Sequence, residues 1–191
     1  MEEKVDDDFG ELTLNQFESA MKTVSKKHGE KYKFILKAGH SLKNALFCFY
    51  SIVGKNEVIP DKWRESLLLQ KFKKPNNNSL ENIRFLHIKD CIPKLFSQIV
   101  LSSFKNDLHA NMTKYQIATK PGHRSTEHLF VILSLIQLYE TTGRSVLITM
   151  YDIKAFFDSE SVFDCLSELY KGQIRGKIYR LLFNLNKIIE D

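Results

Sequence analysis

The chain has 191 residues, of which 43% are hydrophobic, 12% aromatic and 27% charged. Four prolines and eight glycines are too few for a collagen-like or low-complexity chain, and the apolar content is enough for a folded core. No uncharged apolar run reaches the roughly 18 to 20 residues of a membrane span, and the first residues, MEEKVDDDFG, are acidic where a signal peptide is basic. The composition therefore argues against a membrane or secreted protein and favours an intracellular one, in the nucleus or the cytoplasm.

The N-terminal part of the chain predicts a tail followed by helices. Residues 1–12 are acidic and have no apolar periodicity, which predicts a disordered tail. Apolar spacing then indicates a helix beginning near Leu14 and a second helix from about Ser41 to Val53. We assign residues 13–57 to an N-terminal helical extension.

A β-hairpin is predicted in the next part of the chain, after a short helix around Trp63 that follows Pro60. The run Leu67 to Leu69 has the composition of a strand. The stretch KKPNNNSLEN is a turn by composition, and the strand-like piece IRFLHI follows it. A strand, a basic turn and a second strand in this order predict a hairpin.

Helices dominate the remainder. Asp90 is a plausible N-cap for a long helix, in which Pro93 is tolerated because it falls in the first turn. The segment from about Thr126 to Thr142 is apolar nearly all round, which predicts a deeply buried helix. Two further helices are expected at about 161–170 and 176–189.

The basic residues are gathered into blocks within a net charge of +5. Residues 22–43 carry seven lysines against one acid, residues 71–94 six bases against two acids, and residues 171–187 five bases and no acid. Such blocks fit a polyanion partner, because neutralised phosphates release counterions and drive nucleic-acid binding. The alternative is that each block is a solvated lysine face.

A candidate metal ligand follows the apolar segment SVLITMY, which comes after Gly143 and predicts a buried strand. Asp152 stands where this strand ends. A carboxylate held there enters the crevice beyond the strand ends and suits Mg²⁺, which takes one or two carboxylates plus phosphates and water. The alternative is a turn or N-cap aspartate, and Asp158, six residues on, is best explained as a helix cap.

The predicted hairpin is a candidate phosphate site. Lys71, Lys73 and Lys74 flank the polar turn, and Arg84 returns on the opposite strand. Lysine as a point charge and arginine as a bidentate fork could hold a triphosphate between them. The alternative is a solvated hairpin tip.

Three segments together resemble the reverse transcriptases of non-LTR (LINE-like) retrotransposons, in order across about residues 58–183. The first, IPDKWRESLLLQKFKKPNNNSLENIRFLHIKDCIPKLFSQIVLSSF, is similar to the fingers of that family. The second, YQIATKPGHRSTEHLF, resembles its glutamine, glycine-rich and Arg-Ser-Thr segment. The third, YDIKAFFDSE, resembles its first catalytic motif. The resemblance implies an RNA-directed DNA polymerase, a nucleotidyltransferase acting with Mg²⁺ on a dNTP, an RNA template and a DNA primer.

The resemblance also implies residue roles. Asp152 would be the first catalytic, magnesium-binding carboxylate, and Ile153 would lend a backbone carbonyl to the same metal. Phe157 would be the steric gate against a ribonucleotide 2′-hydroxyl, and Lys73 and Arg84 would hold the incoming triphosphate. Three more residues would lie near the template path: Gln116, Lys120 and Arg124.

The sequence departs from the family at several points. No adjacent Asp-Asp pair follows Asp152, and the only run of aspartates, Asp6 to Asp8, lies in the acidic tail. Phe85 stands where the family usually has proline, and Ala118 and Thr119 replace a common Gly-Phe pair. One strand-end acid does not position two cations, so we predict that this polypeptide alone is catalytically inactive, with doubtful Mg²⁺ binding of its own.

The expected fold is α+β: helix-rich fingers plus the first part of a reverse-transcriptase palm, with an incomplete sheet, over residues 58–191. An exposed apolar strand edge is expected near residues 145–151, open to a missing palm or thumb segment or to self-association. Two other functions stay open. The first alternative is a non-enzymatic RNA-binding module derived from a retroelement, in which Asp152 only caps a helix. The second is a helical scaffold with solubilising lysines.

Overall fold

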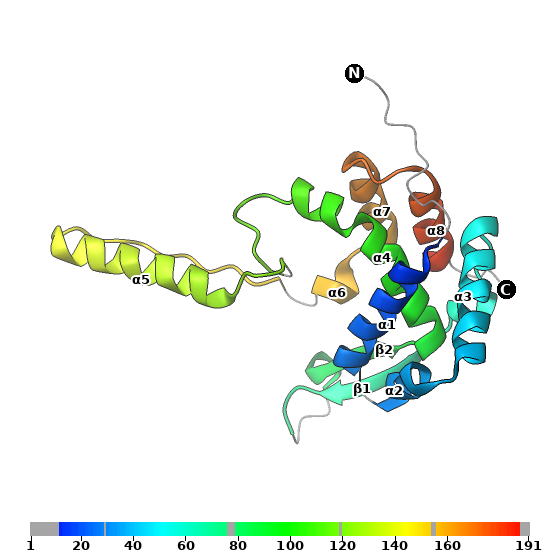
Figure 1. Cartoon of the computed structure of the whole chain (residues 1–191). Coiled ribbons are helices and arrows are strands. Elements are labelled where there is room, and N and C mark those ends of the chain that lie inside the picture. The colour runs from blue at the N-terminus through cyan, green and yellow to red at the C-terminus, as the bar shows by residue number, and fades with distance from the viewer. Residues whose placement is uncertain (1–11, 29, 76–78, 119, 154–155, 188–191) are drawn as a thin grey trace.

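The computed structural model describes residues 12–28, 30–75, 79–118, 120–153 and 156–187. The predicted acidic tail lies outside the described residues except for Leu12. The elements run along the chain as helices α1 (Leu14–His28), α2 (Glu30–Lys37) and α3 (His40–Asn56), 3₁₀ turn η1 (Asp61–Trp63), strand β1 (Leu67–Phe72), 3₁₀ turn η2 (Leu80–Asn82), strand β2 (Ile83–Ile88), and helices α4 (Cys91–Asn111), α5 (Ser125–Thr141), α6 (Phe156–Ser159), α7 (Val162–Lys171) and α8 (Gly176–Asn186) (Figure 1). None of the described helices combines the length and apolar content that crossing a bilayer requires.

The sequence predicted most of these elements correctly. The helices expected near Leu14, at 41–53, after Asp90, and at 161–170 are all present, and the final helix ends at Asn186 within the described residues. Their apolar stripes are buried as the 3.6-residue period requires, with Phe17, Met21 and Val24 facing inward on α1.

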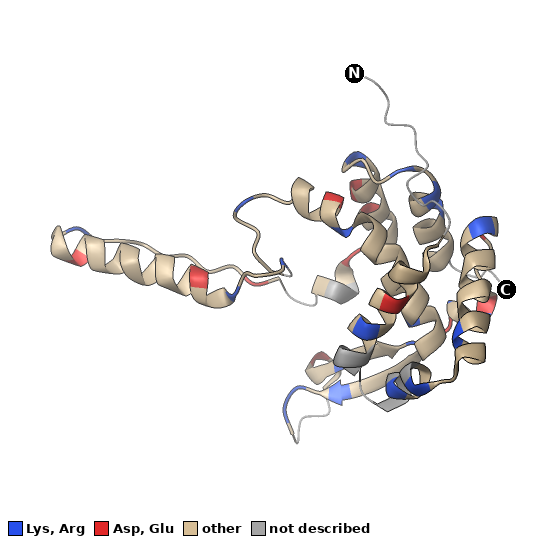
Figure 2. Ribbon diagram, in the orientation of Figure 1, with Lys and Arg blue, Asp and Glu red and all other residues tan. Residues whose placement is uncertain are grey.

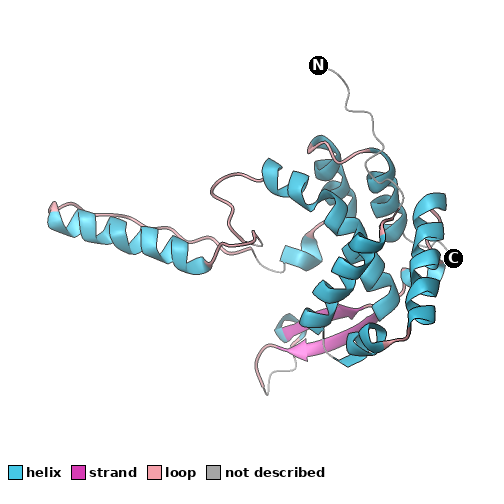
Figure 3. Cartoon of the chain, viewed as in Figure 1, coloured by secondary structure: helices cyan, strands magenta, loops and turns pink. Residues whose placement is uncertain are grey.

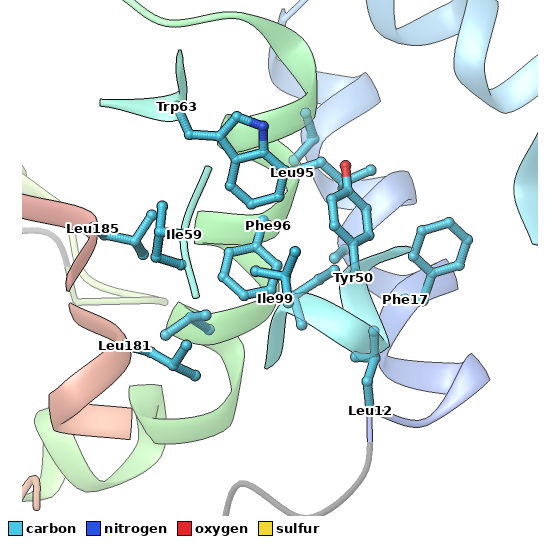
Figure 4. Close-up of a cluster of buried hydrophobic side chains, with 14 of the residues drawn as sticks. Leu12, Phe17, Tyr50, Ile59, Trp63, Leu95, Phe96, Ile99, Leu181 and Leu185 are labelled. Atoms are coloured by element: carbon cyan, nitrogen blue, oxygen red, sulfur yellow. The ribbon is translucent and has the colours of Figure 1, made fainter. Parts of the chain in front are cut away.

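The core is built around a cluster of aromatic rings from four different elements. Tyr50 of α3 and Phe96 of α4 are fully buried, with 0% exposure each. Their ring centroids are 5.7 Å apart, and the Tyr50 hydroxyl donates a hydrogen bond to the backbone oxygen of Ile92 at 2.9 Å. Trp63 of η1 and Phe17 of α1 border the same cluster, and Leu181 and Leu185 of α8 lie at its other side (Figure 4).

This core takes side chains from both of the predicted domains, residues 13–57 and 58–191. Helix α1 packs against α4, and α4 packs against α8. The N-terminal helices therefore share a hydrophobic core with the rest of the body, while the division into an extension and a partial polymerase domain stays a prediction.

A polar latch joins the end of α3 to α8. Glu57, in the left-handed conformation with φ 58°, ends α3. The Arg180 guanidinium donates to both Glu57 carboxylate oxygens, Nε to Oε2 at 2.7 Å and Nη2 to Oε1 at 2.9 Å. The Asn184 side-chain amide donates to the Glu57 backbone oxygen at 3.0 Å. These bonds stabilise the left-handed backbone of Glu57, because both partners belong to α8, which is packed on the core.

The latch makes stability depend on pH. The hydrogen bond from Arg180 holds the pKa of Glu57 below its ordinary value of 4.5. Because the pKa of Glu57 is lower in the folded protein than in the unfolded chain, its ionised carboxylate stabilises the fold at pH values above the unfolded-state pKa. This stabilisation is lost as the pH falls through the pKa of the folded protein. We therefore expect Glu57→Gln to lower the free energy of unfolding by about 0.5 to 1 kcal/mol at pH 7, as is typical of a partly exposed pair.

Urea unfolding of both proteins at a series of pH values from 7 downward measures this effect. The gap between them should close as the pH falls below about 4.5. A gap that stays constant across this range would show that the Glu57 charge does not contribute.

The predicted hairpin is present as a two-stranded antiparallel sheet of β1 and β2, paired from Leu67 with Ile88 to Phe72 with Ile83 (Figure 3). Every residue of β1 is exposed, and β2 is exposed beyond Ile83. The described part of the chain is therefore helix-rich with a small antiparallel sheet, which agrees with the expected α+β class at this coarse level.

Helix α5 forms an arm that projects away from the body (Figure 1). The extent of this helix was predicted correctly, and Gly143 with φ 64° ends it. The prediction of deep burial was wrong, because α5 has no buried residue and Phe130 and Leu133 are 72% and 63% exposed. The apolar composition of α5 predicts burial only if another element packs against the helix, and none of the described elements does so.

The strand predicted over SVLITMY was also wrong. Residues 144–153 belong to no strand, and all of them are exposed. They run from the tip of the arm back toward the body (Figure 1). A strand requires a neighbouring strand to pair with, and the described residues place none beside this segment.

Candidate functional site

The hairpin presents a group of exposed cations. Lys71 on β1 lies directly opposite Arg84 on β2. Directly opposed residues of an antiparallel pair have their Cβ atoms about 4.5 to 5.5 Å apart, so two like charges there repel each other. Neither cation has an ion-pair partner among the described residues. Figure 2 shows this basic stretch on β1 and on the connection that follows it. An anion bound between the two side chains would remove the repulsion.

Lys73 extends this group beyond the end of β1. Its backbone N–H donates to the Asn82 backbone oxygen at 2.7 Å, which continues the ladder by one more pair. Its ammonium group donates to the Glu81 backbone oxygen at 2.7 Å. Lys73 therefore lies on the same hairpin as Arg84, as the sequence predicted, and its side chain is held against the turn.

A buried asparagine, for which the sequence predicted no role, stabilises the turn. Asn82 is 6% exposed. Its side-chain oxygen accepts from the Lys74 N–H at 3.0 Å, and its side-chain nitrogen donates to the Lys74 oxygen at 2.8 Å. These two bonds close the basic turn as a backbone pair would. The signal was an asparagine directly before the second strand, opposite a lysine that follows the first.

Asp152 and Ile153 lie at the body end of the returning segment rather than at the end of a strand. Both residues are exposed, Ile153 by 65%. Phe157 lies in the short helix α6, and its side chain is outside the described residues. The stiff, buried strand that was expected to present Asp152 is therefore replaced by an exposed extended segment.

Mg²⁺ takes several oxygen ligands, of which Asp152 supplies one carboxylate. Among the described residues, no group of three or more His, Cys, Asp or Glu side chains is placed to hold a metal ion. The remaining ligands would have to come from substrate phosphates or from carboxylates elsewhere. Magnesium binding stays a prediction.

The three template-path residues lie on the connection between α4 and α5. Gln116 is exposed and Lys120 half-buried, and both backbone N–H groups close turns. Arg124 is the N-cap residue of α5, where its backbone N–H donates to the Glu127 carboxylate at 3.0 Å. This capping contact gives Arg124 a structural position at the base of the arm.

A histidine also contacts the Glu127 carboxylate at the N-terminus of α5. The His123 ring nitrogen Nδ1 is 2.8 Å from the Glu127 carboxylate. The hydrogen bond from His123, followed by that from the Arg124 backbone, lowers the pKa of Glu127. The segment before the arm is therefore ordered by local bonds to Glu127, the third residue after the N-cap.

The structure thus brings Lys71, Lys73 and Arg84 together on one hairpin. Asp152 lies on a different segment, and no hydrogen bond or ion pair within the described ranges joins it to the hairpin. The predicted crevice shared by Asp152 and the hairpin cations stays a prediction. Comparison of the chain with protein-family models, with curated proteins and with solved structures finds no match.

Proposed function

We propose that this chain supplies the fingers and the first palm segment of an RNA-directed DNA polymerase of the non-LTR retrotransposon type, and that it does not extend a primer by itself. The observation that carries the proposal is the braced basic hairpin. Lys71 and Arg84 face each other across its strands without acidic partners among the described residues, and Lys73 continues the group. In the resembling family, the corresponding lysine and arginine hold the incoming dNTP.

The residues present suit the binding part of nucleotidyl transfer. The Arg84 guanidinium offers a planar fork for two phosphate oxygens, and the Lys73 ammonium offers a compact charge beside it. Asp152 and the Ile153 carbonyl would hold Mg²⁺, which would neutralise charge on the phosphates. Phe157 would discriminate against a 2′-hydroxyl, and three residues would follow the template: Gln116, Lys120 and Arg124.

The uncovered arm also supports the proposal. Helix α5 exposes apolar side chains that a completed palm would bury. A single carboxylate at Asp152 does not position two cations, and removing one member of a catalytic unit costs nearly as much as removing all of them. These two features together support an incomplete polymerase that does not extend a primer alone.

Nucleotide binding tests the proposal. A dNTP with Mg²⁺ should bind the chain, and Arg84→Ala or Lys73→Ala should weaken its affinity about 10- to 100-fold, the loss typical of a hydrogen bond to a charged group. Isothermal titration measures this. Lys55→Ala, which removes an exposed lysine at the end of α3, is the matched control and should leave the affinity unchanged.

Three outcomes decide between the alternatives. RNA binding without any dNTP binding would favour the non-enzymatic RNA-binding module. Absence of both RNA and dNTP binding would favour a helical scaffold with solubilising lysines. Primer extension that Asp152→Asn abolishes would confirm the polymerase assignment and contradict the expected inactivity of the isolated chain.

A further inference from the structure

The segment that returns from the arm has an unpaired backbone. Residues 145–151, SVLITMY, are all exposed and contain no charge. Within the described residues, no backbone hydrogen bond is formed by this segment. β-branched and aromatic residues favour strand pairing, and an extended chain with free N–H and C=O groups is a template for another strand.

The apolar side chains of this segment are also uncovered. Leu147, Met150 and Tyr151 are 92%, 90% and 91% exposed. Val146 and Ile148 are less exposed, at 38% and 42%. Pairing with a further strand would satisfy the backbone groups on one edge of the segment and shield part of this apolar surface.

The charges that flank the segment indicate which strand fits. Arg144 precedes it and Asp152 follows it, and each lies four residues from Ile148. Two copies of the segment paired antiparallel about a twofold axis at Ile148 would place Arg144 of each copy directly opposite Asp152 of the other. Opposed residues lie close enough for their side chains to form ion pairs. Both side chains are exposed, and neither has a partner among the described residues.

We propose that residues 145–151 form an interaction surface for a second copy of this chain, in an antiparallel pair centred on Ile148. The contact is isologous, so each Arg144–Asp152 contact occurs twice in the pair. Val146 lies opposite Met150, and Leu147 lies opposite Thr149. Backbone hydrogen bonds and apolar contacts provide the attraction. The two ion pairs set the register, because after a shift by two residues Arg144 of one copy no longer lies opposite Asp152 of the other.

This pairing has a consequence for Asp152. In the dimer its carboxylate faces an arginine of the second copy and is engaged there. The proposal does not rest on the polymerase assignment: a monomeric chain that binds dNTP would overturn only the pairing, and a dimer that binds no dNTP would overturn only the assignment.

Charge reversal tests the register. Sedimentation equilibrium of the full chain should show a monomer–dimer equilibrium. Arg144→Glu or Asp152→Arg alone turns two attractive contacts into two repulsive ones, and each should raise the dimer dissociation constant about tenfold or more. The double variant carrying both substitutions restores opposite charges and should return the constant to within about twofold of the original.

Cysteine crosslinking tests the position of the axis. The background carries Cys48→Ser, Cys91→Ser and Cys165→Ser, because all three cysteines are free thiols. In that background, Ile148→Cys should form a disulfide-linked dimer on oxidation, since residues facing each other across the axis have Cα atoms about 4.5 to 5.5 Å apart, within disulfide reach. Met150→Cys is the matched control, because its counterpart in the second copy lies about 13 Å along the strand.

Several results would overturn the proposal. They are a monomer at every concentration, open aggregates in place of a dimer, a double variant as weak as the single ones, or equal crosslinking by Met150→Cys. The last comparison is stringent because Met150 is the more exposed of the two residues, so unspecific oxidation would favour it. Far-ultraviolet circular dichroism of each variant checks that the helices are retained.

Discussion

Replacing Phe96 with alanine should lower the free energy of unfolding by about 3 to 5 kcal/mol, whereas the same replacement at Phe130 should change it by less than about 0.5 kcal/mol. Phe96 is fully buried, and its ring centroid lies 5.3 Å from that of Trp63 and 5.7 Å from that of Tyr50. Its removal leaves a cavity among large rings that cannot collapse to fill it. Phe130 is 72% exposed on the arm, so its removal takes little apolar surface from a packed site.

Urea denaturation followed by circular dichroism measures both changes at a concentration where the chain is monomeric. Because the two variants undergo the same chemical change, differences between them report only the surroundings of the ring. An equal loss at Phe130 would mean that α5 is packed against the body, and a small loss at Phe96 would mean that the aromatic cluster is not the core.

Replacing Asn82 with alanine should cost about 1 to 3 kcal/mol, the cost of leaving buried polar groups without partners. Both hydrogen bonds to Lys74 disappear, and the backbone N–H and C=O of Lys74 lose the partners that close the basic turn. The Lys74 amide should exchange faster with solvent, and the affinity for a dNTP or for RNA should fall, because Lys73 and Arg84 are positioned by the same turn.

Asn82→Asp keeps only one of the two bonds. Aspartate keeps an acceptor for the Lys74 N–H but places a second carboxylate oxygen against the Lys74 oxygen, which lies 2.8 Å from the present amide nitrogen. Because this charge would be buried beside an acceptor, Asn82→Asp should cost at least as much as Asn82→Ala. Asn106→Ala, on an exposed position of α4, is the matched control and should leave the stability unchanged or slightly raised, since alanine favours a helix. Unchanged amide exchange at Lys74 in Asn82→Ala would contradict the bracing role.

The hairpin and the latch differ in how far a sequence can predict them. The cations Lys71, Lys73 and Arg84 could be assigned to one hairpin from the strand composition and the turn residues between them, because pairing across a short turn is local. The contact between Glu57 and Arg180 joins residues 123 positions apart and has no local signal. Asn82 lies between these cases, since its partner Lys74 is eight residues away across the turn.

Local pattern in this chain determined most of the helical segments and which stripe of α1, α4 and α8 turns inward, because these depend on residues three or four positions apart. Tertiary structure alone decided what covers each apolar surface. Phe96 and Phe130 both lie in apolar helices, yet one is enclosed by rings from distant segments and the other faces solvent. For the same reason SVLITMY, a strand by composition, stays unpaired, since a strand forms only where a second one lies beside it.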